Sequence, residues 1–254
     1  MADAAHSPSD HGHGDHGHGE HPPHLAHHFD TLHQQFEAGK LGMWAFIAQE
    51  VLFFSGLFAA YAVYRFNHPE VFVYASHFLD TTLGFINTCV LLFSSLTMAW
   101  AVRCAQIGDR RWLIIFLWIT ILCGFGFMGI KYVEYKAKWE HSTLWGAGYH
   151  PNEEAIEHAF SHGHGKDKAH GDSHFTPPQE PANVRTFFAV YFCLTGLHGV
   201  HVIVGIGFLF WLLIRSYRSD FSPEYFAPVD FVGLYWHVVD LIWIFLFPLL
   251  YLIH

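Results

Sequence analysis

Charged residues are scarce in this sequence, and their scarcity excludes an ordinary soluble domain. Lys, Arg, Asp and Glu make up 14% of the 254 residues, whereas a typical soluble domain carries about 25%. Hydrophobic residues make up 52% of the chain and aromatic residues 18%. So little charge beside so much apolar surface is typical of a protein that lives in lipid.

Cysteine is also rare, and the N-terminal residues lack an apolar stretch. The four cysteines, Cys89, Cys104, Cys123 and Cys193, show neither metal-ligand spacing nor a disulfide framework, so we interpret them as packing residues. Because residues 1–30 are polar, we expect no cleaved secretory signal and an uncleaved first span. The net charge of −9 argues against a nucleic-acid partner.

Five long apolar segments are present, and their lengths match a lipid bilayer. A spanning helix needs about 20 apolar residues to cross a hydrocarbon core of about 30 Å. The segments lack the alternation of a strand, and lipid offers no partner to backbone groups outside a helix or a closed barrel. They comprise residues 41–65, 81–102, 112–130, 187–214 and 232–253. We therefore predict an all-α, polytopic membrane bundle with five transmembrane helices.

The basic residues of the short connections predict an orientation. Residues 67–80 contain no Lys or Arg, whereas residues 103–111 contain three and residues 215–230 contain two. The positive-inside rule then places the N-terminus in the cytoplasm and the C-terminus on the periplasmic side of a bacterial cytoplasmic membrane. The long connection before the fourth span would also be periplasmic.

Two segments, residues 1–40 and residues 141–183, hold most of the 23 histidines. Runs of His, Gly and Asp cannot bury enough apolar surface to fold alone. We therefore expect a disordered His-rich tail at 1–40 and a His-rich loop at 141–183 within a bundle of residues 41–254. Imidazole binds Zn, Cu and Ni, so incidental metal affinity is expected, with metal sequestration near the membrane as the alternative.

Six ionisable or imidazole side chains lie inside or beside the spans and are the candidate functional residues. An ionised side chain in lipid costs several kcal/mol, so it must be protonated, paired or close to water, and such residues are functional candidates by default. The candidates are Glu50, Glu134, His198, His201, His237 and Asp240. The spacing of His198 from His201, and of His237 from Asp240, places each pair on one helix face.

Two interpretations of these residues remain open, a metal site and an interhelical hydrogen-bond network. Carboxylate-bridged metal bundles use repeated Glu-x-x-His motifs, which this sequence lacks, so we favour the network. Glycines at 196, 199, 205 and 207 favour close helix contact around the histidine pair. The run "GFGFMG" at 124–129 matches a dinucleotide fingerprint, but it lies within an apolar span and is interpreted as a helix contact.

Several segments together resemble subunit III of the haem-copper oxidases. They are "WAFIAQEVLFFSGLFAAY" (44–61), "LGFINTCVLLFSSLTMAWA" (83–101), "KYVEY" (131–135), "TGLHGVHVIVG" (195–205) and "YWHVVDLIWIFLFPLLY" (235–251). They occur in the order found in that family. The resemblance covers nearly all of the chain from residue 41 onwards, apart from the His-rich loop.

The resemblance implies an accessory subunit of a proton-pumping cytochrome c oxidase. Such a subunit packs against subunit I beside subunit II, sometimes with further small subunits, supports proton uptake and active-site stability, and holds phospholipid. It carries no catalytic residue, haem or copper. Those groups lie in the partner subunits, which reduce oxygen to water with cytochrome c as donor. Glu50 matches the family's carbodiimide-reactive carboxylate, and the other five candidates match polar positions of the family bundle.

Two departures from the family keep alternatives open. Many members have seven helices, of which the first two form one wall of a lipid cleft; this chain lacks both and has a longer connection before the fourth span. The matching subunit of a quinol oxidase, or a nitric-oxide-reductase accessory protein, would also have five helices. A metal transporter with His-rich loops is the alternative from another class, and the lack of an internal repeat argues against it.

Overall fold

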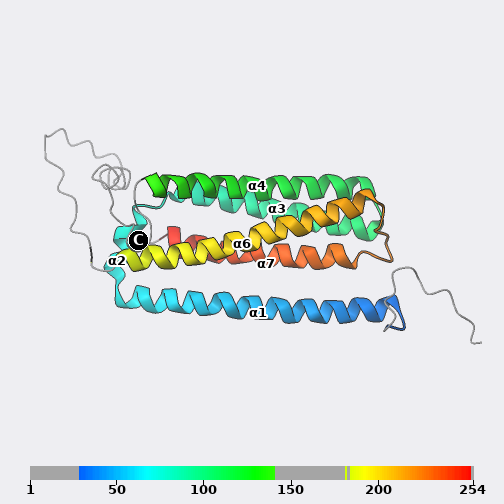
Figure 1. The fold of residues 1–254 in the computed structure, drawn as a ribbon, viewed down its shortest axis with the longest axis horizontal. Coiled ribbons are helices and arrows are strands. Elements are labelled where there is room, and N and C mark those ends of the chain that lie inside the picture. Colours follow the sequence, from blue (N-terminus) through cyan, green and yellow to red (C-terminus); the bar gives the residue numbers. More distant parts are fainter. Residues whose placement is uncertain (1–28, 141–180, 182–183, 253–254) are drawn as a thin grey trace, which may run out of the picture. The chain divides into compact units, whose positions relative to one another are not determined.

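The computed structural model describes residues 29–140, 181 and 184–252 (Figure 1). The predictions for the His-rich tail up to residue 28 and for nearly all of the loop at 141–183 fall outside the described residues. Contacts divide the chain after Gly39 into two units, and the second unit, Lys40–His254, contains the bundle.

The first helix, α1 (Leu32–Asn67), begins inside the predicted tail because local hydrogen bonds cap it. Thr31 Oγ1 accepts from the Gln34 N–H at 3.1 Å, and Gln34 Oε1 accepts from the Asp30 N–H at 2.9 Å. This exchange resembles a capping box, which satisfies amides that have no partner within the helix. Residues 32–40 are therefore helical, and the boundary predicted at residue 40 was too late.

Five long helices and one short helix form the described part of the chain. They are α1, α2 (Pro69–Ser76), α3 (Thr81–Ile107), α4 (Arg110–Glu140), α6 (Val184–Tyr217) and α7 (Ala227–Tyr251). All except α2 are long and apolar enough to cross a membrane, and the described residues form no strand beyond one isolated bridge. The prediction of an all-α bundle with five spans is confirmed, whereas α2 was not predicted.

Sequence signals set the helix ends. Asp80 caps α3 because its Oδ1 accepts from the N–H groups of Thr82 and Leu83 at 2.8 and 3.2 Å. Gly108, at φ +83°, ends α3 in the left-handed conformation that glycine adopts without strain. Proline stands in the first turn of α2 and of α7, where its missing N–H costs no helical bond.

The helices α3, α4, α6 and α7 form a closed four-helix arrangement, in which each packs against two of the others (Figure 1). Its tightest contacts lie at glycines: a Cβ on Gly84 would come 2.8 Å from Phe247, and one on Gly205 would come 2.9 Å from Trp236. In the run at 124–129 the predicted helix contact is found at Gly124, where a Cβ would come 3.1 Å from Ile206 and from Trp236. Of the four glycines around the histidine pair, only Gly205 has the predicted close contact. Around Gly196, Gly199 and Gly207 there is open space.

Helix α1 packs on the bundle through long side chains. Phe46 lies 5.9 Å from the Tyr235 ring, Phe54 lies 5.5 Å from the His201 ring, and Tyr61 lies 5.1 Å from the Phe72 ring. Only Glu50, Phe54 and Tyr61 of α1 are buried. Most of its apolar surface therefore faces outward, where a membrane or a partner protein can cover it.

Candidate functional site

Glu50 and His201 form a pair between α1 and α6. Glu50 Oε2 lies 3.2 Å from His201 Nε2, with side-chain exposures of 10% and 20%. His201 Nδ1 lies 2.8 Å from the carbonyl oxygen of Leu197, one turn earlier on α6. The edge of Phe54 closes one side of the imidazole. The first predicted site residue thus has an imidazole partner within ion-pair distance.

The hydrogen-bond chemistry of His201 fixes how many protons this pair holds. A carbonyl oxygen only accepts, so Nδ1 carries a proton and donates it to Leu197. Nε2 and Oε2 lie at ion-pair distance without hydrogen-bond geometry, so their contact is electrostatic, and one further proton on the imidazole or on the carboxyl group removes the net charge. Either arrangement leaves the pair neutral, which is the low-cost state for two titratable groups in lipid. Glu50 and His201 can therefore exchange a proton without adding net charge to the bundle.

His198 does not join this pair, although it lies three residues from His201. Its ring is fully buried against Phe127 and Trp243, with ring centroids 5.5 and 5.3 Å away. Neither ring nitrogen has a hydrogen-bond partner among the described residues. The two histidines diverge because residues three apart on a helix point about 60° apart, enough to face different neighbours.

His237 and Asp240 make no direct contact with each other, and both lie near Ser95 of α3. His237 Nδ1 lies 2.7 Å from Ser95 Oγ on α3. Asp240 is buried near the same Ser95, although neither carboxylate oxygen has a well-formed hydrogen bond within the described part of the chain. The single network predicted from the five residues in the spans is therefore replaced by separate local contacts.

Asn87 of α3 is a buried polar residue that sequence reasoning missed. It is fully buried, and both amide atoms lack a partner among the described residues. The register of α3 against α7 places it near the level of Trp243, about one helical turn from the level of Asp240, because the neighbouring Thr88 Oγ1 accepts from Trp243 Nε1 at 3.1 Å. We call Asn87, His198 and Asp240 the mid-bundle polar residues.

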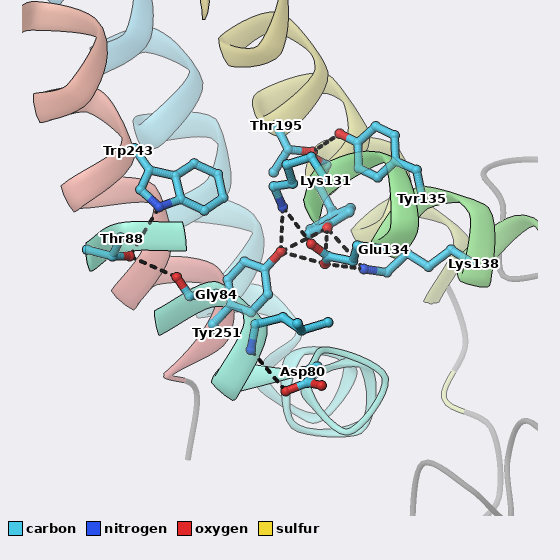
Figure 2. Close-up of polar contacts among 12 residues, drawn as sticks. Asp80, Gly84, Thr88, Lys131, Glu134, Tyr135, Lys138, Thr195, Trp243 and Tyr251 are labelled. Atoms are coloured by element: carbon cyan, nitrogen blue, oxygen red, sulfur yellow. Dashed lines mark hydrogen bonds and ion pairs between the residues drawn. The ribbon is translucent and has the colours of Figure 1, made fainter. Parts of the chain in front are cut away.

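Glu134 lies at the end of the bundle where α2 is found, among charged and phenolic groups (Figure 2). Its Oε2 accepts from Lys131 Nζ at 2.8 Å. Its Oε1 accepts from Lys138 Nζ at 2.7 Å, from Tyr191 Oη at 2.7 Å and from Tyr251 Oη at 2.6 Å. We call these five residues the lysine–glutamate cluster. It joins α4 to α6 and α7 through charge-assisted bonds, which are the strong class of hydrogen bond.

Aromatic rings surround the buried ammonium group of Lys131. Its Nζ lies 4.6 Å from the Trp243 ring centroid and 5.2 Å from that of Tyr251, while it also donates to Tyr251 Oη at 2.7 Å. Ring faces attract cations, and the attraction grows when water is excluded. The indole thus contacts this cluster on one side and His198 on the other.

The sequence contained a signal for this cluster that boundary reasoning overlooked. Lys131, Glu134 and Lys138 are spaced i, i+3 and i+7, which places all three on one helix face. The predicted third span ended at residue 130, before all three of these residues. Instead α4 continues to Glu140, because the Glu134 carboxylate pairs with both ammonium groups one turn away on the same helix face.

The described residues offer no set of three His, Cys, Asp or Glu side chains arranged to hold a metal ion. The rings of Phe127 and Trp243 occupy the space beside His198. What the arrangement does offer is an ion-pair contact at Glu50 and His201, a carboxyl group at Asp240 and a cluster of two lysines around Glu134.

Comparison with protein families matches residues 24–143 and 182–254 to the family described as cytochrome c oxidase subunit III. This chain belongs to that family. All six candidate residues lie in the matched segments, whereas residues 144–181, in the His-rich connection, lie outside them. Membership makes the chain a subunit III of the haem-copper oxidases, and therefore a membrane-bound component that associates with other oxidase subunits.

Relatives of both oxidase types are similar to the chain. Cytochrome c oxidase subunit 3 of Bacillus subtilis is 30% identical over 213 residues, covering 84% of each chain. Quinol oxidase subunit 3 of the same species is 27% identical over 224 residues, covering 87% of this chain and 91% of the relative. The probable quinol oxidase subunit 3 of Staphylococcus aureus is 26% identical over 231 residues, covering 91% and 96%.

Proposed function

We propose that this chain is the accessory subunit III of a proton-pumping cytochrome c oxidase in a bacterial cytoplasmic membrane. It packs directly on subunit I, beside subunit II and any further small subunits. Haem and copper belong to those partners, which take electrons from cytochrome c and reduce oxygen to water. This chain carries no redox centre, and it supports proton uptake and the stability of the catalytic subunit.

The Glu50–His201 pair is the observation that carries the proton-linked part of this proposal. A carboxyl group and an imidazole 3.2 Å apart in an apolar setting can accept or release a proton. The pair lies where the loosely packed α1 meets the bundle, so a small movement of α1 would alter the contact. Glu50 and His201 would thus hold a proton, while the partner subunits supply all oxygen chemistry.

The distribution of arginines supports an orientation with the N-terminus in the cytoplasm. The α3–α4 turn and the α6–α7 connection lie at the same end of the bundle, because Arg110 Nε donates to the Ser216 carbonyl at 2.9 Å. That end carries Arg103, Arg110, Arg111, Arg215 and Arg218. The short connection at the other end, residues 67–80, contains no Lys or Arg, and the positive-inside rule is counted over such short connections.

A quinol oxidase is the second candidate, because two relatives with high mutual coverage bear that name. Other subunits bind the electron donor, so the decisive measurement uses the whole complex. The complex purified through this chain should contain haem and copper subunits and should oxidise reduced cytochrome c. Oxidation of quinol alone would favour the second candidate, and purification of the chain without haem proteins would overturn both.

Labelling with a lipid-soluble carbodiimide tests the role of Glu50, since the reagent modifies protonated carboxyl groups in apolar surroundings. We expect label on the peptide that contains Glu50 and none after Glu50→Gln. Glu134 should remain unlabelled, because two ammonium groups hold it as a carboxylate. In reconstituted oxidase, Glu50→Gln should lower the proton-to-electron ratio at high turnover, whereas the exposed control Glu70→Gln should not. A Glu50→Gln complex that pumps like wild type would refute the proton-linked role.

A further inference from the structure

Ser95 of α3 lies beside two polar side chains of α7. Its Oγ lies 2.7 Å from His237 Nδ1, and the Asp240 carboxyl group lies near the same hydroxyl. Asp240 is buried near the middle of α7, whereas Ser95 and His237 are half-buried at the seam between the two helices. A carboxyl group, a hydroxyl group and an imidazole therefore follow one another from the core of the bundle to its surface.

No lysine or arginine among the described residues pairs with Asp240. Cys123 of α4 is a titratable side chain that faces it, and a thiol carries no positive charge. The His198 imidazole of α6 packs against aromatic rings instead, and Lys131 of α4 pairs with Glu134. Because an unbalanced carboxylate is costly in the hydrocarbon region, the Asp240 carboxyl group is expected to hold a proton.

The single hydrogen of the Ser95 hydroxyl sets the direction of these contacts. When Ser95 donates that hydrogen to His237 Nδ1, its Oγ can only accept from Asp240. A protonated carboxyl group can donate to Ser95, whereas a carboxylate only accepts. His237 then carries its ring hydrogen on Nε2, since a neutral imidazole has one N–H. A neutral Asp240 therefore completes a directed chain of donors that an ionised Asp240 would interrupt.

We propose that Asp240, Ser95 and His237 form a proton relay, in which Asp240 stores one proton and exchanges it at the surface of α3 and α7. Asp240 passes its proton to Ser95 Oγ while Ser95 passes its own proton to His237 Nδ1. The imidazolium then releases its Nε2 proton to an acceptor at the surface, and the same steps in reverse reload Asp240. The relay shares no residue with the Glu50–His201 pair, so it goes beyond the proposed function and is independent of the electron donor.

Infrared spectroscopy of the purified oxidase complex during transfer from light to heavy water tests the relay. The C=O stretch of a protonated carboxyl group shifts when its hydrogen is exchanged, and the band that disappears in Asp240→Asn is assigned to Asp240. Ser95→Ala removes the bridge, Ser95→Thr retains a hydroxyl group, and His237→Phe removes the end at the surface. Ser55→Ala is the matched control, because it deletes an exposed serine hydroxyl of α1. Haem content of each preparation reports complex integrity separately.

The Asp240 band should be present in the wild-type complex at neutral pH, and its exchange should slow at least about tenfold in Ser95→Ala and in His237→Phe. Ser95→Thr and Ser55→Ala should exchange at the wild-type rate. Absence of a protonated-carboxyl band that Asp240→Asn removes would overturn the proposal. So would equal exchange rates in wild type, Ser95→Ala and His237→Phe. Glu50→Gln should leave the band and its exchange unchanged, so this test and that of the Glu50–His201 pair can fail separately.

Discussion

The lysine–glutamate cluster and the mid-bundle polar residues differ in hydrogen bonding, although both are buried. In the cluster, both carboxylate oxygens of Glu134 accept bonds of 2.6–2.8 Å from ammonium and phenol donors. In the middle of the bundle, the polar side-chain atoms of Asn87, His198 and Asp240 have no partner among the described residues. Both sets are buried in the same four-helix arrangement.

Buried polar groups with complete hydrogen bonds stabilise the fold, whereas buried polar groups without hydrogen bonds destabilise it. Removing one partner of a fully hydrogen-bonded buried charge is costly, because the remaining charged groups stay buried without compensation. A buried polar group without a partner costs stability as long as it is present. The cluster is therefore expected to be structural, and the mid-bundle residues are the better functional candidates beside Glu50 and His201.

The largest expected effect comes from removing the charge at the centre of the cluster. Glu134→Gln leaves two buried ammonium groups without their carboxylate and should destabilise the chain by about 3–5 kcal/mol. Unfolding by titration with denaturing detergent in mixed micelles measures this loss. The exposed control Glu70→Gln should change stability by less than about 0.5 kcal/mol. Similar stability for Glu134→Gln and wild type would show that the cluster does not hold the helices together.

A smaller loss is expected when the charges stay and one bridging hydroxyl is removed. Tyr251→Phe deletes the group that accepts from Lys131 and donates to Glu134. Bonds to charged groups contribute about 1.5–3 kcal/mol, and the loss should fall in that range in the same detergent titration. Tyr132→Phe, at an exposed position of α4, is the control and should behave like wild type.

The mid-bundle residues should respond with the opposite sign. Asn87→Leu replaces an unpartnered amide by an apolar side chain of similar size and should stabilise the chain by about 1 kcal/mol. The neighbouring buried position provides the matched control, since Leu91→Asn should destabilise it. If Asn87→Leu lowers stability by more than about 1 kcal/mol, the Asn87 amide makes hydrogen bonds in the folded protein, and its contrast with the cluster is wrong.

The smallest loss of stability should come from breaking a hydrogen bond between two neutral side chains, which gives a reference for the charge-assisted bonds of the cluster. Thr97 Oγ1 and Thr120 Oγ1 lie 2.8 Å apart between α3 and α4. Thr97→Val keeps the shape and should cost about 0.6 kcal/mol, the average for side-chain bonds between membrane helices. A cost near that of Tyr251→Phe would mean that charge adds little to the cluster.

Sequence reasoning located the spans well and their limits less well. Apolar length identified all five long helices, but α1 starts at Leu32 and α4 ends at Glu140, beyond the predicted apolar limits. Local capping at Thr31 and charge pairing at Glu134 extend these helices into polar sequence. The short helix α2 was missed because it is shorter than any spanning pattern.

Partner choice among the candidate residues could not be derived from spacing. Residue spacing put His198 and His201 on one face, yet one packs against Trp243 and the other meets Glu50. Asn87 and Tyr251 gave no signal that distinguished them from other residues of their helices. Which side chains meet depends on the rotation and register of each helix, and these are set by contacts such as Gly205 against Trp236.

By itself, the sequence determined that this chain is a bundle of five membrane helices with a few ionisable groups inside, because lipid enforces helix length and penalises every buried charge. It also carried the motifs of the subunit III family. Only the tertiary structure decided that Glu50 meets His201, that Glu134 pairs with two lysines, and that Asp240 lacks a well-formed hydrogen bond among the described residues. Such pairings arise where helices far apart in the chain pack together, and no local pattern encodes their rotation.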